Sequence, residues 1–192
     1  MSIATRKTMV FIDGGYLRRK LLDIKGDDIF DIAKFQNELC KRLVTNRSFF
    51  HYELIRTYYY DCNFDLTDSS LSDAYKTKFS DNKRLFDGLN SRRKVEVKLG
   101  HLSNSTPPRQ KGMDVLIAID MLSKAFDNHY DIGILFCGDN DFIPIVKAIK
   151  DQTGKRVFGG FFKDHCPLEL MMEFDEYYEI RYPHSSFHEF GL

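Results

Sequence analysis

The sequence has few of the features that mark secreted, membrane-bound or zinc-finger proteins. Cysteine is scarce, and no cysteines show the short spacing of a zinc site or a redox motif. No apolar run is long enough to cross a bilayer, and no signal-peptide pattern is present. We therefore expect reduced thiols, no membrane partner and a cytoplasmic location. The cysteines are Cys40, Cys62, Cys137 and Cys166.

The chain also has no excess of charge of either sign, since 28 lysine and arginine residues balance 28 aspartate and glutamate residues. This balance argues against a strongly basic nucleic-acid binder but permits local basic patches. Such patches lie at 18–20, at 92–94 and at Arg109 with Lys111. For 92–94 we favour a solvated surface, the usual role of short charge runs. Lys111 lies three residues before Asp114, where an ammonium group would hold a substrate phosphate.

Internal repeats, heptads and low-complexity tracts are absent, so 192 residues with 43% hydrophobic content predict one globular domain. We place this domain at 1–182, with a short tail at 183–192. Strand-length apolar runs alternate with amphipathic segments, which predicts an α/β protein with a mostly parallel sheet and helices on both faces. Strands are expected near 8–13, 53–61, 94–99, 132–137, 156–162 and 177–180, and helices near 16–24, 29–44, 70–91, 113–127, 142–151 and 167–174.

Aspartates follow the apolar strands at the ends where ligands bind in open α/β sheets. Asp13 follows a short apolar run, and Asp139 with Asp141 follows the nearly continuous apolar run at 132–136. Asp114 opens an amphipathic segment. Helix capping explains any one of them alone, but capping gives no reason for their gathering at one sheet edge. Because clustered carboxylates repel one another, we expect a divalent cation such as Mg²⁺, bound through oxygen ligands.

The chain carries three short motifs in order, which read VFIDGGYL at 10–17, QKGMDVLIAID at 110–120 and CGDNDFIP at 137–144. Together they resemble the NYN domain, a branch of the PIN-like nuclease superfamily that includes bacterial LabA-like proteins. The resemblance extends from Met9 to Ile180. The last two motifs are specific in combination, whereas a lone GDxD would be a weak signal.

The resemblance implies a PIN-like three-layer α/β/α sandwich that binds Mg²⁺ or Mn²⁺ and hydrolyses phosphodiester bonds, in RNA more than in DNA. Many relatives carry asparagine where this chain has Tyr16, so a polar contact to phosphate or metal-bound water is missing here or supplied differently. The metal ligands and catalytic residues that the resemblance implies are Asp13, Asp114, Asp139 and Asp141, and the substrate contacts are Lys111, Arg109, Tyr16 and Asn140.

Two alternatives stay open at this stage. The first is a nucleic-acid-binding or regulatory module that keeps the fold with little or no catalytic activity, an alternative that Tyr16 keeps open. The second is a phosphatase of the haloacid dehalogenase type, whose nucleophile motif pairs two aspartates two residues apart. Here Asp13 is followed by Gly14 and Gly15, which argues against the phosphatase.

Three further features have a structural and a functional interpretation. Asp120 lies about 120° around the helix from Asp114, so we expect it to support the site or the fold rather than to bind the metal. The tyrosines at 58–60 are expected to pack in a strand, with base stacking the less favoured role. Phe187 and Phe190 in the tail are expected to pack on the body of the protein or on a partner, which leaves a homodimer open.

Overall fold

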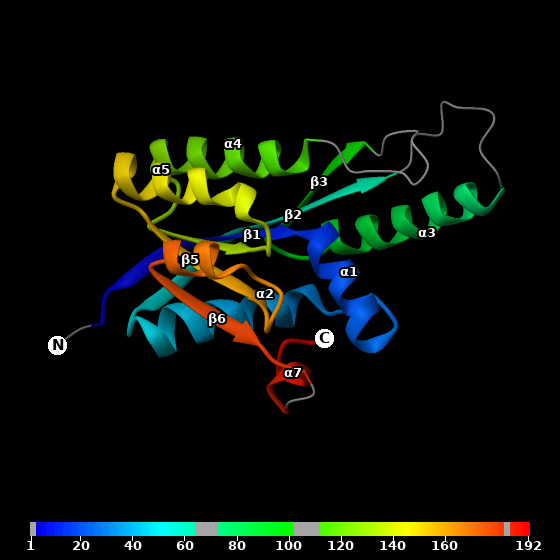
Figure 1. Cartoon of the computed structure of the whole chain (residues 1–192), viewed down its shortest axis with the longest axis horizontal. Helices are drawn as coiled ribbons and strands as arrows, with labels where there is room; N and C mark the ends of the chain where they lie inside the picture. Colours follow the sequence, from blue (N-terminus) through cyan, green and yellow to red (C-terminus); the bar gives the residue numbers. More distant parts are fainter. Residues whose placement is uncertain (1–2, 64–72, 102–111, 183–184) are drawn as a thin grey trace.

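A central sheet lies between two layers of helices in the computed structural model, which describes residues 3–63, 73–101, 112–182 and 185–192 (Figure 1). All strands are parallel, in the order β3-β2-β1-β4-β5-β6. This arrangement confirms the predicted three-layer α/β fold of PIN-like type. The strands are β1 (Thr5–Asp13), β2 (His51–Asn63), β3 (Val95–His101), β4 (Ile132–Phe136), β5 (Arg156–Phe162) and β6 (Glu176–Ile180).

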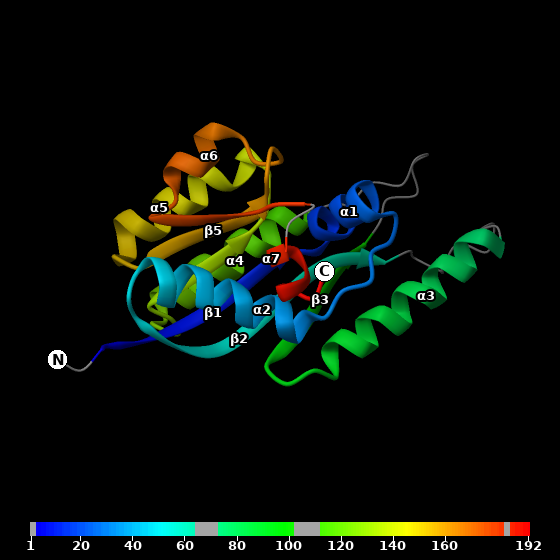
Figure 2. The ribbon, with the colours of Figure 1, turned by 90° about the horizontal axis from the view of Figure 1, so that it is seen from below.

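The helices divide between the two faces of the sheet. Helices α4 and α5 cover one face, and Figure 2 shows α2 and α7 in front of the opposite face. None of the helices in the described ranges is long and apolar enough to cross a membrane. The helices are α1 (Gly14–Lys25), α2 (Ile32–Cys40), the π-helical η1 (Lys41–Arg47), α3 (Asp73–Asn90), α4 (Met113–Phe126), the 3₁₀ turn η2 (Asn140–Phe142), α5 (Ile143–Thr153), α6 (Leu168–Glu173) and α7 (Ser185–Glu189).

The direction in which the sheet is built changes at β1. The chain adds β2 and β3 on one side of β1 and then crosses over to add β4 on the other side. Such a reversal opens a crevice beyond the carboxyl ends of the two central strands. The residues from Thr8 to Ile12 in β1 pair with β4 from Ile132 to Phe136. Asp13 and the turn that carries Asp139 therefore leave the sheet from neighbouring strands.

The tyrosines of β2 belong to the core. Tyr58, Tyr59 and Tyr60 are at most 7% exposed. Tyr58 stacks on Phe11 of β1, with their ring centroids 5.6 Å apart. This burial confirms that the three side chains pack in a strand, as predicted, and it leaves their faces unavailable to bases.

The helix expected at 29–44 is divided and begins later than predicted. The Asp31 side chain accepts hydrogen bonds from the amides of Ala33 and Lys34, which fixes the start of α2 at Ile32. The chain then changes to the π-helical turn η1 after Cys40. Hydrophobic spacing does not distinguish a π turn from a continuous α-helix, so this change cannot be predicted from the hydrophobic pattern.

The tail packs on the body of the protein through two buried aromatic rings. Phe190 is fully buried, and its ring centroid lies 5.9 Å from that of Phe35 and 5.7 Å from that of Tyr178. Phe187 is 2% exposed and lies near Phe162. The short helix α7, which the sequence did not predict, carries Phe187 into this position. Both rings are covered within the chain, and the homodimer stays a prediction.

Candidate functional site

Asp13 occupies the junction between β1 and α1. Its backbone is extended, and its Oδ1 accepts a hydrogen bond of 2.9 Å from the amide of Tyr16, which caps α1. Burial raises the pKa of Asp13 to about 6, against the opposing effect of the Tyr16 amide. The charges of Asp114 and Asp61 raise it further. The fold therefore holds a carboxylate where ionisation is unfavourable.

Asp139 occupies the equivalent junction after β4. It is exposed and extended, and its Oδ1 accepts a hydrogen bond of 3.0 Å from the amide of Asp141. Asn140 and Asp141 follow it in the exposed turn η2. Asp139 and Asp141 thus both lie at the carboxyl edge of the sheet, and the side chain of Asp139 stabilises the turn that holds them.

Asp114 approaches the same edge from another element. It lies in the first turn of α4, after Gly112 in a left-handed conformation with φ of 72°. Burial raises the pKa of Asp114, and the charges of Asp139 and Asp141 raise it further. Since Asp114 in turn raises the pKa of Asp13, the four predicted acids share one negative electrostatic environment.

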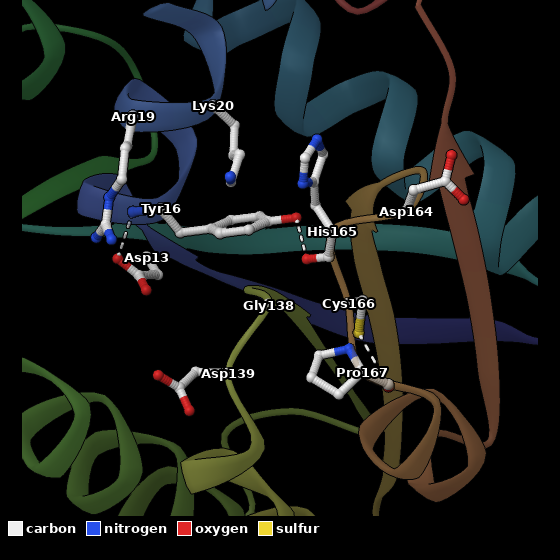
Figure 3. Close-up of a pocket in the computed structure, with 10 residues that line it drawn as sticks. All are labelled: Asp13, Tyr16, Arg19, Lys20, Gly138, Asp139, Asp164, His165, Cys166 and Pro167. Carbon is white, nitrogen blue, oxygen red and sulfur yellow. Dashed lines mark hydrogen bonds between the residues drawn. The ribbon is translucent and has the colours of Figure 1, made fainter. Parts of the chain in front are cut away.

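The chemistry of these side chains fits an open divalent-metal site rather than a closed cage. In the described part of the chain, no three His, Cys, Asp or Glu side chains are close enough to enclose a metal ion by themselves. Mg²⁺ commonly takes one or two carboxylates and completes its octahedron with water and substrate oxygens. Asp13 and Asp139 each use one oxygen for a capping hydrogen bond, which leaves the other oxygen for such a role. Figure 3 shows the two side chains facing the same pocket from separate turns.

The pocket that these two aspartates face has a volume of about 450 Å³. It opens between α1 and the loop that follows β5 (Figure 3). Its lining combines acidic, basic and aromatic side chains. The lining residues are Asp13, Tyr16, Arg19, Lys20, Gly138, Asp139, Asp164, His165, Cys166 and Pro167.

Tyr16 fixes the far wall of this pocket. Its hydroxyl donates a hydrogen bond of 3.0 Å to the carbonyl of His165 and accepts one of 3.1 Å from the amide of Phe162. The side chain is 8% exposed, and burial raises the pKa of its phenol. Tyr16 was predicted as a substrate contact, but its hydroxyl is engaged with the backbone, so a contact with substrate would come from the ring.

Gly138 lets the acidic turn and this wall pack together. A Cβ atom at this position would lie 2.3 Å from the His165 carbonyl oxygen and 2.5 Å from the Tyr16 ring. No side chain fits at such distances, because one of these neighbours would have to move. Glycine is therefore required between Cys137 and Asp139 for steric reasons.

Asp61 is a charged neighbour of the site that the sequence analysis missed. It lies near the end of β2 and is 3% exposed. Its Oδ2 is 3.4 Å from the Arg18 guanidinium, and its Oδ1 accepts a hydrogen bond of 2.7 Å from the Cys62 amide. Burial raises the pKa of Asp61, and Arg18 opposes this increase. The sequence signal for it is an acid near the carboxyl end of a strand, the same position that Asp13 occupies in β1.

Asp120 is held away from the acidic edge by its partners. It accepts hydrogen bonds from the Tyr60 hydroxyl at 2.8 Å, the Lys98 ammonium at 2.6 Å and the Lys124 ammonium at 3.0 Å. Burial raises the pKa of Asp120, but these three hydrogen bonds outweigh that effect and lower it overall. The residue joins α4 to β2 and β3, in agreement with the supporting role predicted for it.

The two other predicted substrate contacts, Arg109 and Lys111, lie outside the described residues. Asn140, the fourth, is exposed beside Asp139. The substrate roles of all three stay predictions.

Comparison with known proteins identifies the family and shows a related fold among solved structures. The family model of the NYN domain matches residues 7–181. A crystal structure of VPA0982, a protein of unknown function from Vibrio parahaemolyticus RIMD 2210633, is similar with a TM-score of 0.64 and 20% sequence identity. The similarity covers 94% of this chain and 96% of that chain, and at this identity it shows a shared fold alone. No curated protein matches the chain.

Replacing Asp13 by asparagine is expected to stabilise the metal-free protein at high pH. Asparagine keeps the helix cap but removes the charge. The pKa of Asp13 is about 6 in the folded protein against an ordinary value of 3.8. The ionised carboxylate therefore lowers the free energy of unfolding, and this loss is complete above the folded pKa. The loss decreases as the pH falls toward 3.8, because the folded protein then takes up the proton. Urea unfolding near pH ~8 should show a gain of about 1–3 kcal/mol that disappears near pH ~4.

Asp81→Asn is the control, because it removes an exposed acid that pairs with Arg84 at 3.8 Å, and it should change stability little at either pH. A variant Asp13→Asn that is less stable than wild type at high pH would contradict the burial argument.

Replacing Gly138 by alanine should destabilise the fold and distort the site. The added Cβ meets the His165 carbonyl at 2.3 Å, so the loss should reach about 1–3 kcal/mol, as in other overpacked positions. Gly88→Ala is the matched control, because that glycine lies within α3 and an added Cβ meets nothing within 4 Å. It should stabilise by about 0.5–1 kcal/mol. Equal unfolding midpoints for the two variants would show that the turn and the wall do not pack as described.

Proposed function

We propose that this chain, which belongs to the NYN domain family, is a metal-dependent ribonuclease that hydrolyses phosphodiester bonds of single-stranded RNA. The family lies within the PIN-like nuclease superfamily, and the finer assignment rests on the site. The observation that carries it is the pair Asp13 and Asp139, which face one pocket from the carboxyl ends of adjacent parallel strands. Asp114, electrostatically coupled to both, adds a third carboxylate.

The metal would be Mg²⁺ or Mn²⁺, held by Asp13 and Asp139 with Asp114 and Asp141 as direct or water-mediated ligands. When bound, the ion supplies positive charge for the phosphate and activates water for attack on phosphorus. The hard oxygen donors of this chain suit such ions, and sulfur and imidazole donors are not needed.

The chain's own residues orient the reacting groups. The capping hydrogen bonds from the amides of Tyr16 and Asp141 fix the rotation of the carboxylates of Asp13 and Asp139. With a pKa of about 6, Asp13 is ionised at neutral pH and ready to accept a cation. In-line attack by water needs no nucleophile from the protein, so no aspartyl-phosphate is formed. This separates the proposal from the phosphatase alternative, in which Asp13 itself would attack.

A catalytically inactive RNA-binding module is the second candidate. The observation in its favour is Tyr16, which stands where many relatives have asparagine and whose hydroxyl is engaged with the backbone of Phe162 and His165. No other polar atom of this side chain is left for a water or a phosphate oxygen. The module would keep the fold and bind RNA without turnover.

Cleavage of labelled single-stranded RNA, with DNA of the same sequence alongside, tests the proposal. Purified protein should cut RNA with Mg²⁺ or Mn²⁺ and not with EDTA. Asp13→Asn and Asp139→Asn should each lower the rate by about 100-fold or more, as expected for loss of a group that organises transition-state charge. Asp81→Asn should leave the rate unchanged, because that acid is on the surface of α3.

RNA binding without cleavage by the wild-type protein, at every metal tested, would support the inactive module. Cleavage that persists in both active-site variants would exclude these aspartates as the catalytic centre.

A further inference from the structure

The pocket beside the acidic edge is lined by side chains of both charges. Asp13 and Asp139 contribute carboxylates, and Arg19 and Lys20 of α1 contribute cations, with the Arg19 guanidinium beside the Asp13 carboxylate (Figure 3). Both cations belong to the helix that Asp13 caps, whereas Asp139 follows β4. Such a mixed lining suits a ligand that is polyanionic and extends beyond the metal site.

Arg19 and Lys20 are more available to an anion than the arginine before them. Arg19 is exposed and makes no hydrogen bond or close ion pair within the described residues, and its charge acts on Asp13, where it lowers the pKa of that carboxyl. Lys20 meets Asp23 at 3.3 Å, and the side chain of Asp23 is 57% exposed, so this pair is weak. In contrast, Arg18 is held by Asp28 at 2.5 Å in a partly buried ion pair. Neighbouring cations of one helix thus have different roles.

The remaining carboxylate at the pocket, Asp164, does little to neutralise these cations. Its side chain is 80% exposed, and its closest charged partner is Lys163 at 4.0 Å. The pocket wall formed by His165 is meanwhile fixed by the Tyr16 hydroxyl and by contact with Gly138. A ligand would therefore enter a preformed site, without first ordering its wall.

Resting on the proposed nuclease function, we propose that Arg19 and Lys20 bind the backbone phosphate next to the scissile phosphate of single-stranded RNA, and that the pocket holds the nucleotide between the two phosphates. A volume of about 450 Å³ is at the lower end of the range of ~300–1,000 Å³ typical of small-ligand pockets. It suits one nucleotide. A duplex would have to unpair and flip that nucleotide, which costs a few kcal/mol, so the subsite favours single strands.

The double variant R19A/K20A tests this subsite by binding alone. A fluorescently labelled oligouridine would be titrated with full-length protein in the Asp139→Asn background with Mg²⁺, so that the RNA stays intact. The dissociation constant should rise about tenfold near ~0.1 M salt, and the slope of log K against log salt should fall by about 0.7, the value for one phosphate contact. The same background binding a blunt RNA duplex as tightly as oligouridine would overturn the single-strand assignment.

The control variant is K83A/R84A, which removes an adjacent lysine and arginine from the exposed surface of α3 and changes the net charge equally. Their side chains are 62% and 81% exposed, and they pair with Asp87 and Asp81. The control should bind oligouridine like the parent. Equal affinity and equal salt slope for R19A/K20A and K83A/R84A would overturn the subsite, as would absence of RNA binding by the parent.

The two proposals fail in different ways. If RNA binding depends on Arg19 and Lys20 but the wild-type protein never cleaves, the subsite is supported and the nuclease function is contradicted. If the wild-type protein cleaves RNA but binding does not depend on these two residues, the nuclease function is supported and the subsite is contradicted.

Discussion

Negative charge is gathered at the carboxyl edge of the sheet, where burial and mutual repulsion raise the pKa of Asp13 and of Asp114. Asp13 ends β1, which lies between two paired strands, and it caps α1, so the Tyr16 amide holds one of its carboxylate oxygens. Burial raises its pKa to about 6, and Asp114 and Asp61 add to the repulsion. This arrangement lowers the stability of the fold. Buried charges of this kind are typical of sites where function requires them.

One packing contact joins this charged edge to the pocket beside it. Tyr16 lies in the first turn of α1, three residues after the capping aspartate, and its hydroxyl binds the backbone at Phe162 and His165. Gly138 lies against both the Tyr16 ring and the His165 carbonyl. The start of α1, the end of β4 and the loop after β5 therefore form one rigid frame. Asp13, Asp139 and the loop that carries His165 keep fixed relative positions because they belong to this frame.

The elements that depend on local pattern could be predicted from the sequence. The roles of side chains whose partners are distant in the chain could not. Apolar and tyrosine-rich runs located the six strands of the described residues, and the motifs placed the aspartates at strand ends. The role of Tyr16 depends on backbone groups 146 and 149 residues away, which no local pattern reveals. Asp61 acquires its charge environment from Arg18, a pairing made by the fold. The helix α7 is five residues long and is held by tertiary packing, without a periodic signal of its own.

Whether the carboxyl edge binds a divalent cation can be decided by locating the ion. Crystals of the protein soaked in Mn²⁺ would be measured for anomalous scattering. We expect a peak between Asp13 and Asp139, within coordination distance of at least one carboxylate oxygen of each, and no peak there in crystals of Asp139→Asn. Mn²⁺ bound elsewhere, or an edge that stays free of metal in soaked wild-type crystals, would contradict this expectation.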